Sequence, residues 1–273
     1  MIKLPTVSQH MKIHKITANK SFGQHFLLDL NICNKIISVA PSTITGKVVL
    51  EVGPGPGGLT RAILACNPKK LIAIEKDISF IKLLHEIPVL SSSKLEIIYG
   101  DALHFDLSSI KANHIIIISN LPYNIGTKLI VRWLHQISLI EYIIVMLQDE
   151  VVERIISSHS KKKYGRLTVL SQLVSDVRKC FKVSSKVFNP PPKIDSSVLL
   201  MVPKKQQLDK HTIENVQNIT KLAFNSRRKK LKNCLGTLLT SKNITNEVFN
   251  TILHQRPEQL TPEQYVQLSR ILL

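Results

Sequence analysis

A chain of 273 residues is long enough for one large α/β domain with a small partner domain, and too short for three domains. Hydrophobic residues make up 44% of it and charged residues 21%, which excludes a disordered chain, a collagen-like fibre and a membrane bundle. The formal net charge of +18 favours a polyanionic partner such as nucleic acid.

The positive charge is unevenly distributed. Residues 45–149 carry ten basic and nine acidic side chains, whereas residues 204–273 carry twelve and five. A neutral catalytic centre with basic flanks is the pattern expected of an enzyme that holds a nucleic acid around its site. The alternative is a composition bias of the whole proteome, because Lys outnumbers Arg 28 to 9.

The basic leader, residues 1–28, has neither the apolar stretch of a secretory signal nor the Arg-rich character of a mitochondrial one. The longest apolar runs, such as 142–147, are far shorter than the roughly 18 to 20 residues that a bilayer span needs. We therefore expect a cytoplasmic protein with no transmembrane helix.

Two residue types in the chain are typical of metal or redox sites. His10 and His14 have the i,i+4 spacing of a metal pair, but no third ligand is near them in the sequence, and we predict no metal site. The cysteines form no CxxC pair, and we expect reduced, buried thiols: Cys33, Cys66, Cys180 and Cys234.

After the leader the chain alternates between helical and strand patterns. Asp29 is expected to cap a helix that buries Ile32, Ile36, Ile37 and Ala40. Five β-branched runs follow, with helical spacing between them: Val48–Val52, Leu71–Glu75, Leu95–Tyr99, His114–Ser119 and Glu141–Leu147. The pattern predicts a doubly wound, mostly parallel α/β sheet, which binds ligands beyond the carboxyl ends of its strands.

The last part of the chain is helical in pattern. Proline runs interrupt it at Pro190–Pro192 and at Pro203, after which Ile213 and its i+3 neighbours mark one helix face. Thr261 begins a capping box before a last helix. We predict a catalytic domain over 1–203 and a small, all-helical domain over 204–273.

The first strand ends in a glycine turn, with Gly53, Gly55, Gly57 and Gly58 following Glu51. Glycines let the backbone turn tightly and approach a ligand. The spacing satisfies both the dinucleotide pattern and the acidic-x-Gly-x-Gly-x-Gly pattern of S-adenosylmethionine enzymes, so the turn alone leaves both cofactors open.

Carboxylates around the turn favour the sulfonium cofactor. Glu75 ends the second strand, where a carboxylate accepts hydrogen bonds from ribose hydroxyls. Glu51 is a poor neighbour for a pyrophosphate but a good one for the cationic methionine moiety. Asp101, after the third strand, is placed to accept from the exocyclic adenine amine, and a helix cap is its alternative interpretation.

The fourth strand is followed by Asn120, Leu121, Pro122 and Tyr123. An exocyclic adenine amine is a poor nucleophile, because its lone pair is delocalised into the ring. The Asn120 side-chain oxygen and the Leu121 carbonyl can accept its two N–H bonds, and Tyr123 supplies a stacking face. This motif predicts N-methylation of adenine, and an Asn-Pro turn is the structural alternative.

The chain resembles the ribosomal RNA adenine N6,N6-dimethyltransferase family, the KsgA type, over essentially its full length. Besides the glycine turn and Glu75, the matching segments are Ser21–Leu27, Gly100–Leu103, Asn120–Tyr123, Val187–Ser196 and Ala223–Lys229. The resemblance implies transfer of methyl groups from S-adenosyl-L-methionine to two adjacent adenosines in the 3′-terminal hairpin loop of small-subunit rRNA, in a precursor subunit. It also implies the methyltransferase type of the doubly wound fold.

The resemblance also implies roles for single residues. The residues expected at the cofactor are His25, Leu27, Glu51, Gly53, Gly55, Gly57, Glu75, Asp101, Ala102 and Asn120. The residues expected at the target amine are Asn120, Leu121, Pro122 and Tyr123, with Phe188 as the opposite wall of the base. The family usually has Asn where this chain has His25.

Two basic segments are the predicted rRNA contacts. They comprise Lys161, Lys162, Lys163 and Arg166 in one loop, and Arg227, Arg228, Lys229, Lys230 and Lys232 near the C-terminal end. We expect the first to be a mobile loop beside the active site, and a solvated helix face is the alternative for the second. The protein is expected to act as a monomer.

Three rival functions can be separated from this one. A nicotinamide dehydrogenase has no support beyond the glycine spacing. The erythromycin-resistance methylases, which modify large-subunit rRNA, share the Asn120–Tyr123 motif but match Pro190–Pro192 less well. A non-catalytic RNA-binding or transcription factor on the same fold is disfavoured by the intact Glu75, Asp101 and Asn120.

Overall fold

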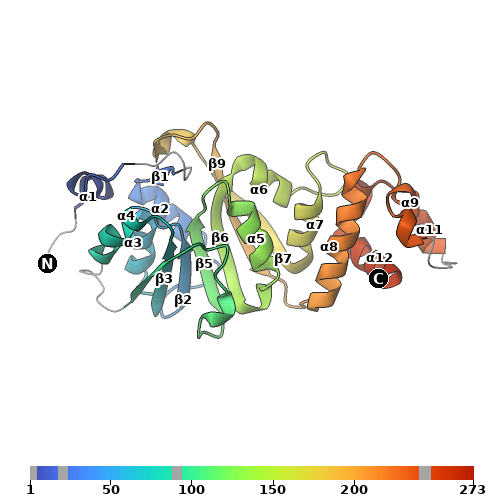
Figure 1. The fold of residues 1–273 in the computed structure, drawn as a ribbon, viewed down its shortest axis with the longest axis horizontal. Coiled ribbons are helices and arrows are strands. Elements are labelled where there is room, and N and C mark those ends of the chain that lie inside the picture. Colours follow the sequence, from blue (N-terminus) through green and yellow to red (C-terminus); the bar gives the residue numbers. More distant parts are fainter. Residues whose placement is uncertain (1–4, 18–23, 88–93, 240–246) are drawn as a thin grey trace.

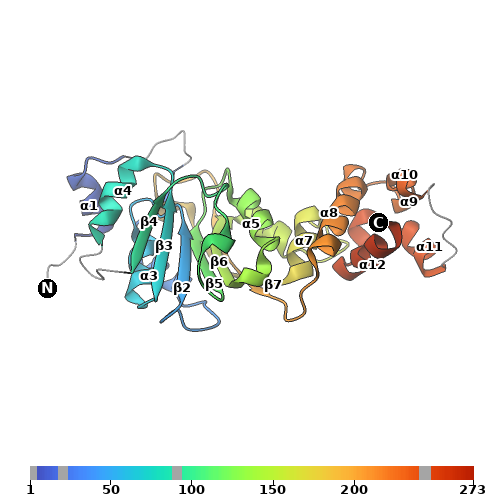
Figure 2. The ribbon, with the colours of Figure 1, turned by 60° about the horizontal axis from the view of Figure 1, so that its bottom comes forward.

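The computed structural model describes residues 5–17, 24–87, 94–239 and 247–273. Of the Ser21–Leu27 segment, the first three residues therefore lie outside the described part. Figure 1 shows an elongated molecule, with an α/β body at the N-terminal end and a group of helices at the C-terminal end. Figure 2 shows the same division after a rotation. No helix within the described ranges is long and apolar enough to cross a membrane.

Seven strands form the central sheet in the order β4-β3-β2-β5-β6-β9-β7. They are β2 (Val48–Val52), β3 (Lys70–Glu75), β4 (Leu95–Tyr99), β5 (Ile115–Asn120), β6 (Ile140–Gln148), β7 (Ser175–Val183) and β9 (Ser196–Pro203). The strands from β4 to β6 pair in parallel, and β9 is antiparallel to both β6 and β7. The chain runs outward from β2 to β4 and returns to β5 on the other side of β2. This reversal makes the carboxyl end of β2 the expected ligand crevice.

Alternate residues of each central strand face two different apolar layers, because side chains alternate along a strand. Leu50 and Ile117 pack with α5 (Gly126–Leu134), whereas Val49 and Ile116 pack with α2 (Leu30–Ile37), α3 (Gly58–Ala65) and α4 (Ile78–His85). Strands covered on both faces are apolar throughout, which explains the continuous β-branched runs in the sequence. The predicted doubly wound, mostly parallel sheet is confirmed.

The leader packs against the α/β body at two places. Helix α1 (Val7–Ile13) lies beside α4 at the N-terminal end of the molecule (Figures 1 and 2). The short strand β1 (Phe26–Leu27) pairs antiparallel with β8 (Phe188–Asn189), in the register Leu27 to Phe188. The Asn189–Pro190 peptide bond is cis. This pairing brings the start of the chain to the proline run before β9.

Helices α6 (Asp149–Ile155) and α7 (Arg166–Val174) connect the body to the C-terminal helices. Those helices are α8 (Lys210–Asn225), α9 (Leu231–Cys234), α10 (Gly236–Leu239), α11 (Glu247–Leu253) and α12 (Pro262–Leu272). The predicted buried face of α8 is confirmed, since Ile213 and Ala223 are both buried. The predicted capping box is also confirmed, with the Thr261 hydroxyl accepting from Gln264 N.

The apolar core continues across the end of β9 at Pro203. The ring of Tyr164, between α6 and α7, lies 6.3 Å from Phe224 of α8, which lies 6.1 Å from Tyr265 of α12. All three belong to the same core as the β2 residue Leu50. The domain boundary near residue 203 stays a prediction, but the two parts share one apolar interior.

Candidate active site

A pocket opens at the carboxyl ends of β2, β3 and β5. Its lining includes the glycine turn after β2, the segment that ends in β1, and Asn120–Tyr123 at the end of β5, together with residues after β3 and β4 and from β8. The predicted site residues that line it are His25, Leu27, Glu51, Gly53, Gly55, Glu75, Asp101, Asn120, Leu121, Pro122, Tyr123 and Phe188. Residues up to 163 positions apart in the chain are thus brought together at the predicted edge of the sheet.

Two predicted cofactor residues are absent from the described lining of this pocket. A Cβ added to Gly57, whose φ is +83°, would lie 2.4 Å from Ile87 Cδ1 behind α4, so this glycine faces the core. Gly58 lines the pocket in its place, and a Cβ there would lie 2.4 Å from the Leu27 carbonyl oxygen. Ala102 is buried in the apolar core next to α5. The glycine spacing is thus partly explained by contacts inside the protein.

Glu51 is a buried carboxyl group, 1% exposed, at the start of the glycine turn. Its Oε2 accepts a hydrogen bond of 2.7 Å from the Thr60 hydroxyl. Burial raises the pKa of Glu51 to about 8, because the hydrogen bond from Thr60 does not offset the loss of water and the nearby Glu75 carboxylate raises the pKa further. A group in this state stabilises a neighbouring cation strongly when it ionises.

Glu75 ends β3 and is fixed by three backbone N–H groups. Its Oε1 accepts from Lys76 N and Asp77 N, both at 2.8 Å, and its Oε2 accepts from Gly55 N at 3.0 Å. Burial nevertheless raises the pKa of Glu75, because the loss of water outweighs the effect of these three donors. The hydrogen bond to Gly55 also ties the end of β3 to the glycine turn.

Asp101 follows β4 and carries a different set of partners. Its Oδ2 accepts from Lys76 Nζ at 2.8 Å, and its Oδ1 accepts from Leu103 N at 2.9 Å. The Lys76 ammonium and the Leu103 amide lower the pKa of Asp101, so the carboxylate is ionised. Residues after Asp101 form a turn and no helix, so the helix-cap alternative is wrong.

The end of β5 is held against the end of β2. Val52 N donates to Ser119 Oγ at 2.8 Å, and Leu121 N donates to Met146 O at 3.2 Å. Asn120 Nδ2 points to the His25 carbonyl oxygen, 3.5 Å away. Because the Asn120 nitrogen is used in this contact, the Asn120 oxygen is left to accept a hydrogen bond from a ligand. Methylation of an amine requires such an acceptor for its N–H bonds.

Aromatic residues surround the outer part of the pocket. The His25 and Tyr123 rings lie 5.8 Å apart, and Phe188, 4% exposed, comes from β8. His25 Nδ1 lies 2.7 Å from Pro190 O, so it carries the proton and donates it to that carbonyl. His25 therefore links the leader to the proline run that follows Phe188.

Sequence reasoning missed part of the lining. Phe80 of α4 and Phe26 of β1 pack edge to face at 5.2 Å, and Lys76 pairs with Asp101. The available signal is Asp77, which caps α4 immediately after β3 and so places the first turn of that helix at the carboxyl edge of the sheet.

The two predicted rRNA-binding segments lie next to each other. Arg227 Nη1 donates to Lys162 O at 2.9 Å, and Arg227 Nε lies 3.7 Å from Glu258. Tyr164 is buried, so the Lys161–Arg166 loop is anchored to α8 and is not the freely mobile loop that we expected. Most of the cations are exposed, namely Lys161, Lys162, Lys163, Arg166, Arg228, Lys229, Lys230 and Lys232.

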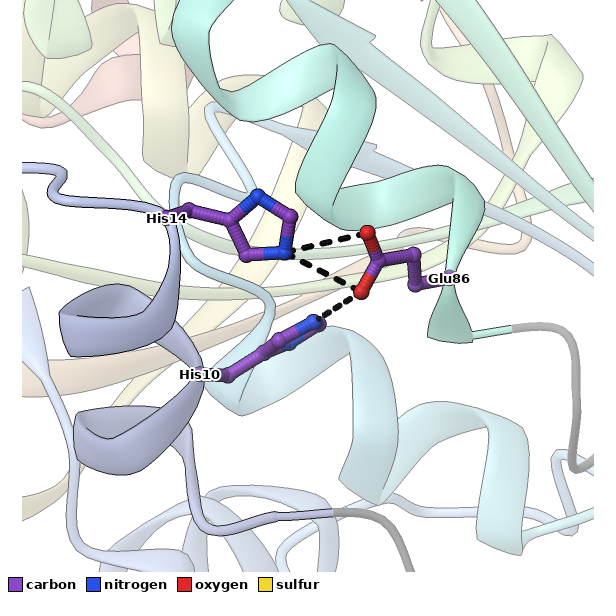
Figure 3. Close-up of side chains that lie close together, drawn as sticks. All are labelled: His10, His14 and Glu86. Atoms are coloured by element: carbon purple, nitrogen blue, oxygen red, sulfur yellow. Dashed lines mark hydrogen bonds and ion pairs between the residues drawn. The ribbon is translucent and has the colours of Figure 1, made fainter.

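His10 and His14 have a third polar partner, Glu86, which lies more than 70 positions away in the sequence. Figure 3 shows both rings directed at the Glu86 carboxylate, with His10 Nε2 at 2.6 Å and His14 Nε2 at 3.0 Å. Arg61 Nη2 lies 3.0 Å from His10 Nδ1. Arginine only donates, so His10 Nδ1 accepts and Nε2 carries the proton that Glu86 accepts.

This arrangement is better explained by hydrogen bonds than by a metal ion. A metal on His10 Nε2 would move the ring proton to Nδ1, opposite the Arg61 donor, where metal-bound histidines need an acceptor. The chain of hydrogen bonds from Arg61 through His10 to Glu86 instead fastens α1 to α3 and α4.

The cysteines carry no disulfide. Cys33 is buried as predicted, whereas the other three are half-buried, so the expectation of buried thiols is wrong for Cys66, Cys180 and Cys234. Cys33 lies near the glycine turn, and burial raises the pKa of its thiol to about 12. The thiol is therefore protonated and unreactive.

Comparison with known proteins gives consistent results. Residues 15–272 match the family model described as ribosomal RNA adenine dimethylase. A protein from Paramagnetospirillum magneticum, called ribosomal RNA small subunit methyltransferase A, is 36% identical over 272 residues, which is 100% of this chain and 96% of that protein. The crystal structure of a dimethyladenosine transferase from Plasmodium falciparum aligns with a TM-score of 0.76 at 25% identity, over 89% of this chain and 96% of that one. The crystal structure of the 23S rRNA methyltransferase ErmE aligns with a TM-score of 0.68 at 24% identity, over 90% of this chain and 99% of that one. This likeness shows the shared fold.

Proposed function

Because the chain belongs to the ribosomal RNA adenine dimethylase family, we propose that this rRNA adenine dimethyltransferase modifies the N6 amines of two adjacent adenosines in the 3′-terminal hairpin loop of small-subunit rRNA. Its methyl donor is S-adenosylmethionine. The relatives named for the small subunit, which match essentially the whole chain, support this substrate. The further proposal is that the substrate is a precursor subunit and that the enzyme acts as a cytoplasmic monomer.

The observation that carries the proposal is that Asn120–Tyr123 and the carboxylates around the glycine turn line one pocket. When bound, S-adenosylmethionine supplies an electrophilic methyl group on a positively charged sulfur. Asn120 Oδ1 and Leu121 O accept the two N–H bonds of the adenine amine, so that the nitrogen lone pair points at the methyl group. Tyr123 and Phe188 hold the base between their rings.

The residues in the pocket fit the donor. Glu51, a buried carboxyl group that accepts a hydrogen bond from Thr60, is suited to the cationic methionine moiety. Glu75 is suited to the ribose hydroxyls, because its two oxygens are held in place by backbone N–H groups. Asp101 is suited to the adenine amine of the cofactor, with Lys76 holding its carboxylate.

The exposed cations beside α8 are the proposed rRNA-binding surface. The Lys161–Arg166 loop and the Arg227–Lys232 segment are joined by the Arg227 to Lys162 hydrogen bond, so their exposed cations lie next to each other. Such a group of cations attracts phosphates irrespective of base sequence and positions the substrate, while the pocket selects the base.

The test is transfer of labelled methyl groups from S-adenosylmethionine to undermethylated small subunits, followed by mapping of the labelled nucleosides. We expect label on N6 of two adjacent adenosines, and none on large subunits. Asn120→Ala should largely abolish transfer but keep the fold and most of the affinity for the subunit, while Asn34→Ala, on the exposed side of α2, should behave like wild type. Label on large subunits would favour the erythromycin-resistance type, and no label on either subunit would favour a non-catalytic RNA-binding protein.

A further inference from the structure

The hydroxyl of Tyr123 is held by a buried serine on a central strand. Tyr123 Oη lies 2.7 Å from Ser196 Oγ, and Ser196 is fully buried. Ser196 begins β9 and pairs with Gln148 of β6 and Val183 of β7. A residue with a strand on each side has little freedom to move, so its hydroxyl is a fixed point at the edge of the pocket.

This bond controls how far the Tyr123 ring can swing. The ring follows Pro122, which limits the backbone on one side, and its other end is held by the hydrogen bond of the phenol oxygen. Rotation about χ1 moves that oxygen by several ångströms, so it breaks the bond to Ser196. The long axis of the ring is therefore set by two attachments, one at Cβ and one at Oη.

The pair contributes direction more than stability. Two hydroxyls taken out of water lose their hydration, and one hydrogen bond between them returns little net free energy, whereas two apolar groups would fill the same space. Burial raises the pKa of the Tyr123 phenol, so it stays protonated and the bond persists at neutral pH. The hydrogen bond between Tyr123 and Ser196 is therefore better explained by the orientation that it gives the Tyr123 ring than by a gain in stability.

We infer that Ser196 is a positioning residue for methyl transfer, which acts by holding the Tyr123 ring where the target adenine stacks. The inference rests on the proposed function of Tyr123 as a wall of the base. A small displacement of such a wall moves the amine away from the methyl group, and transfer rates depend steeply on that alignment. Ser196 itself is not among the described residues that line the pocket.

The experiment compares Ser196→Ala, Tyr123→Phe and the double variant with wild type in single-turnover methyl transfer to undermethylated small subunits. Each single change removes the same hydrogen bond, so we expect each to slow transfer by about three- to tenfold. The double variant should be no slower than the slower single variant, because the two residues act as one unit. Cofactor affinity, measured by calorimetry, should be unchanged in all three.

The matched control is Ser197→Ala. Ser197 is equally buried, is the next residue of β9, and loses a hydrogen bond of 2.6 Å to Asp149 in this variant. We expect Ser197→Ala to lower thermal stability about as much as Ser196→Ala while transferring methyl groups at the wild-type rate.

Two results would overturn the inference. One is equal transfer rates in the Ser196→Ala and Ser197→Ala variants, which would make the Ser196 bond purely structural. The other is a double variant in which the two single effects multiply, since independent residues behave in that way. A wild-type protein that binds the cofactor but transfers nothing to small subunits would instead contradict the proposed function, so the two failures are distinguishable.

Discussion

Replacement of Glu51 by Gln is expected to stabilise the cofactor-free protein at neutral pH and to weaken cofactor binding. Glu51 is buried, and its pKa is raised to about 8 by the loss of water. Gln has nearly the same shape and still offers an oxygen to the Thr60 hydroxyl that bonds to Glu51. The substitution therefore removes the titration of this group while it keeps the packing.

The magnitude follows from the two pKa values. A carboxyl with a pKa of 4.5 in the unfolded chain and about 8 in the folded protein binds more protons when folded over the range between them. The stability that protonated Glu51 contributes is thus present below pH 4.5 and is lost as the pH rises toward 8. Between pH 5 and 7 this loss amounts to about 2 to 3 kcal/mol. Carboxyls with lowered pKa, such as Asp149 beside Lys179, act in the opposite direction, so only the difference between the two proteins isolates Glu51.

The assay is urea unfolding of wild type and Glu51→Gln across this pH range, without cofactor. The difference in free energy of unfolding should grow in favour of the variant by about 2 to 3 kcal/mol between pH 5 and 7. Calorimetry in buffers of different ionisation enthalpy should then show that wild type releases more protons on cofactor binding than the variant does. A stability difference that does not change with pH would refute the raised pKa, and equal proton release would separate Glu51 from the cofactor's positive charge.

Three further substitutions test other parts of the molecule. Glu75→Ala should weaken S-adenosylmethionine binding by roughly 1.5 to 3 kcal/mol per lost charge-assisted hydrogen bond, and an unchanged dissociation constant in calorimetry would exclude Glu75 from the site. If Arg228 contacts a phosphate, Arg228→Glu should weaken subunit binding and reduce the slope of log affinity against log salt concentration by roughly 0.7 to 0.9. Lys210→Glu, at the exposed first position of α8, should leave this slope unchanged. Glu86→Ala should speed amide hydrogen exchange in α1, because it removes the acceptor shared by His10 and His14; unaltered exchange there would mean that apolar packing alone holds the helix.

The fold could be predicted because each central strand is apolar on both faces. The runs Val48–Val52 and Leu95–Tyr99 match β2 and β4 at both ends, and β3, β5 and β6 differ by one residue at one or both ends. Glu75, Asp101 and Asn120 each stand at or just after the end of a strand. Because the carboxyl ends of parallel strands meet at one edge of the sheet, the sequence predicted that these residues share a site. Local sequence therefore located the pocket and most of the residues that line it.

Contacts between distant segments could not be predicted in the same way. The hydrogen bond of His10 with Glu86 joins residues 76 positions apart, and no periodicity encodes it. The orientation of Gly57 toward Ile87 depends on how α4 packs behind the turn, which the glycine spacing does not specify. The anchoring of Tyr164 depends on a helix that begins after residue 203. In each case the deciding partner belongs to another part of the chain.

The shared interior of Tyr164, Phe224 and Tyr265 limits how this enzyme can be recombined. A chain that ends at Pro203 would leave the Tyr164 ring facing water, together with the apolar side of α7, and would tend to aggregate. Transplanting the C-terminal helices onto another methyltransferase would require the Lys161–Arg166 loop to travel with them, because that loop supplies both the buried ring and part of the basic surface. Any substrate specificity that depends on these helices can thus be transferred to another enzyme only together with part of the catalytic body.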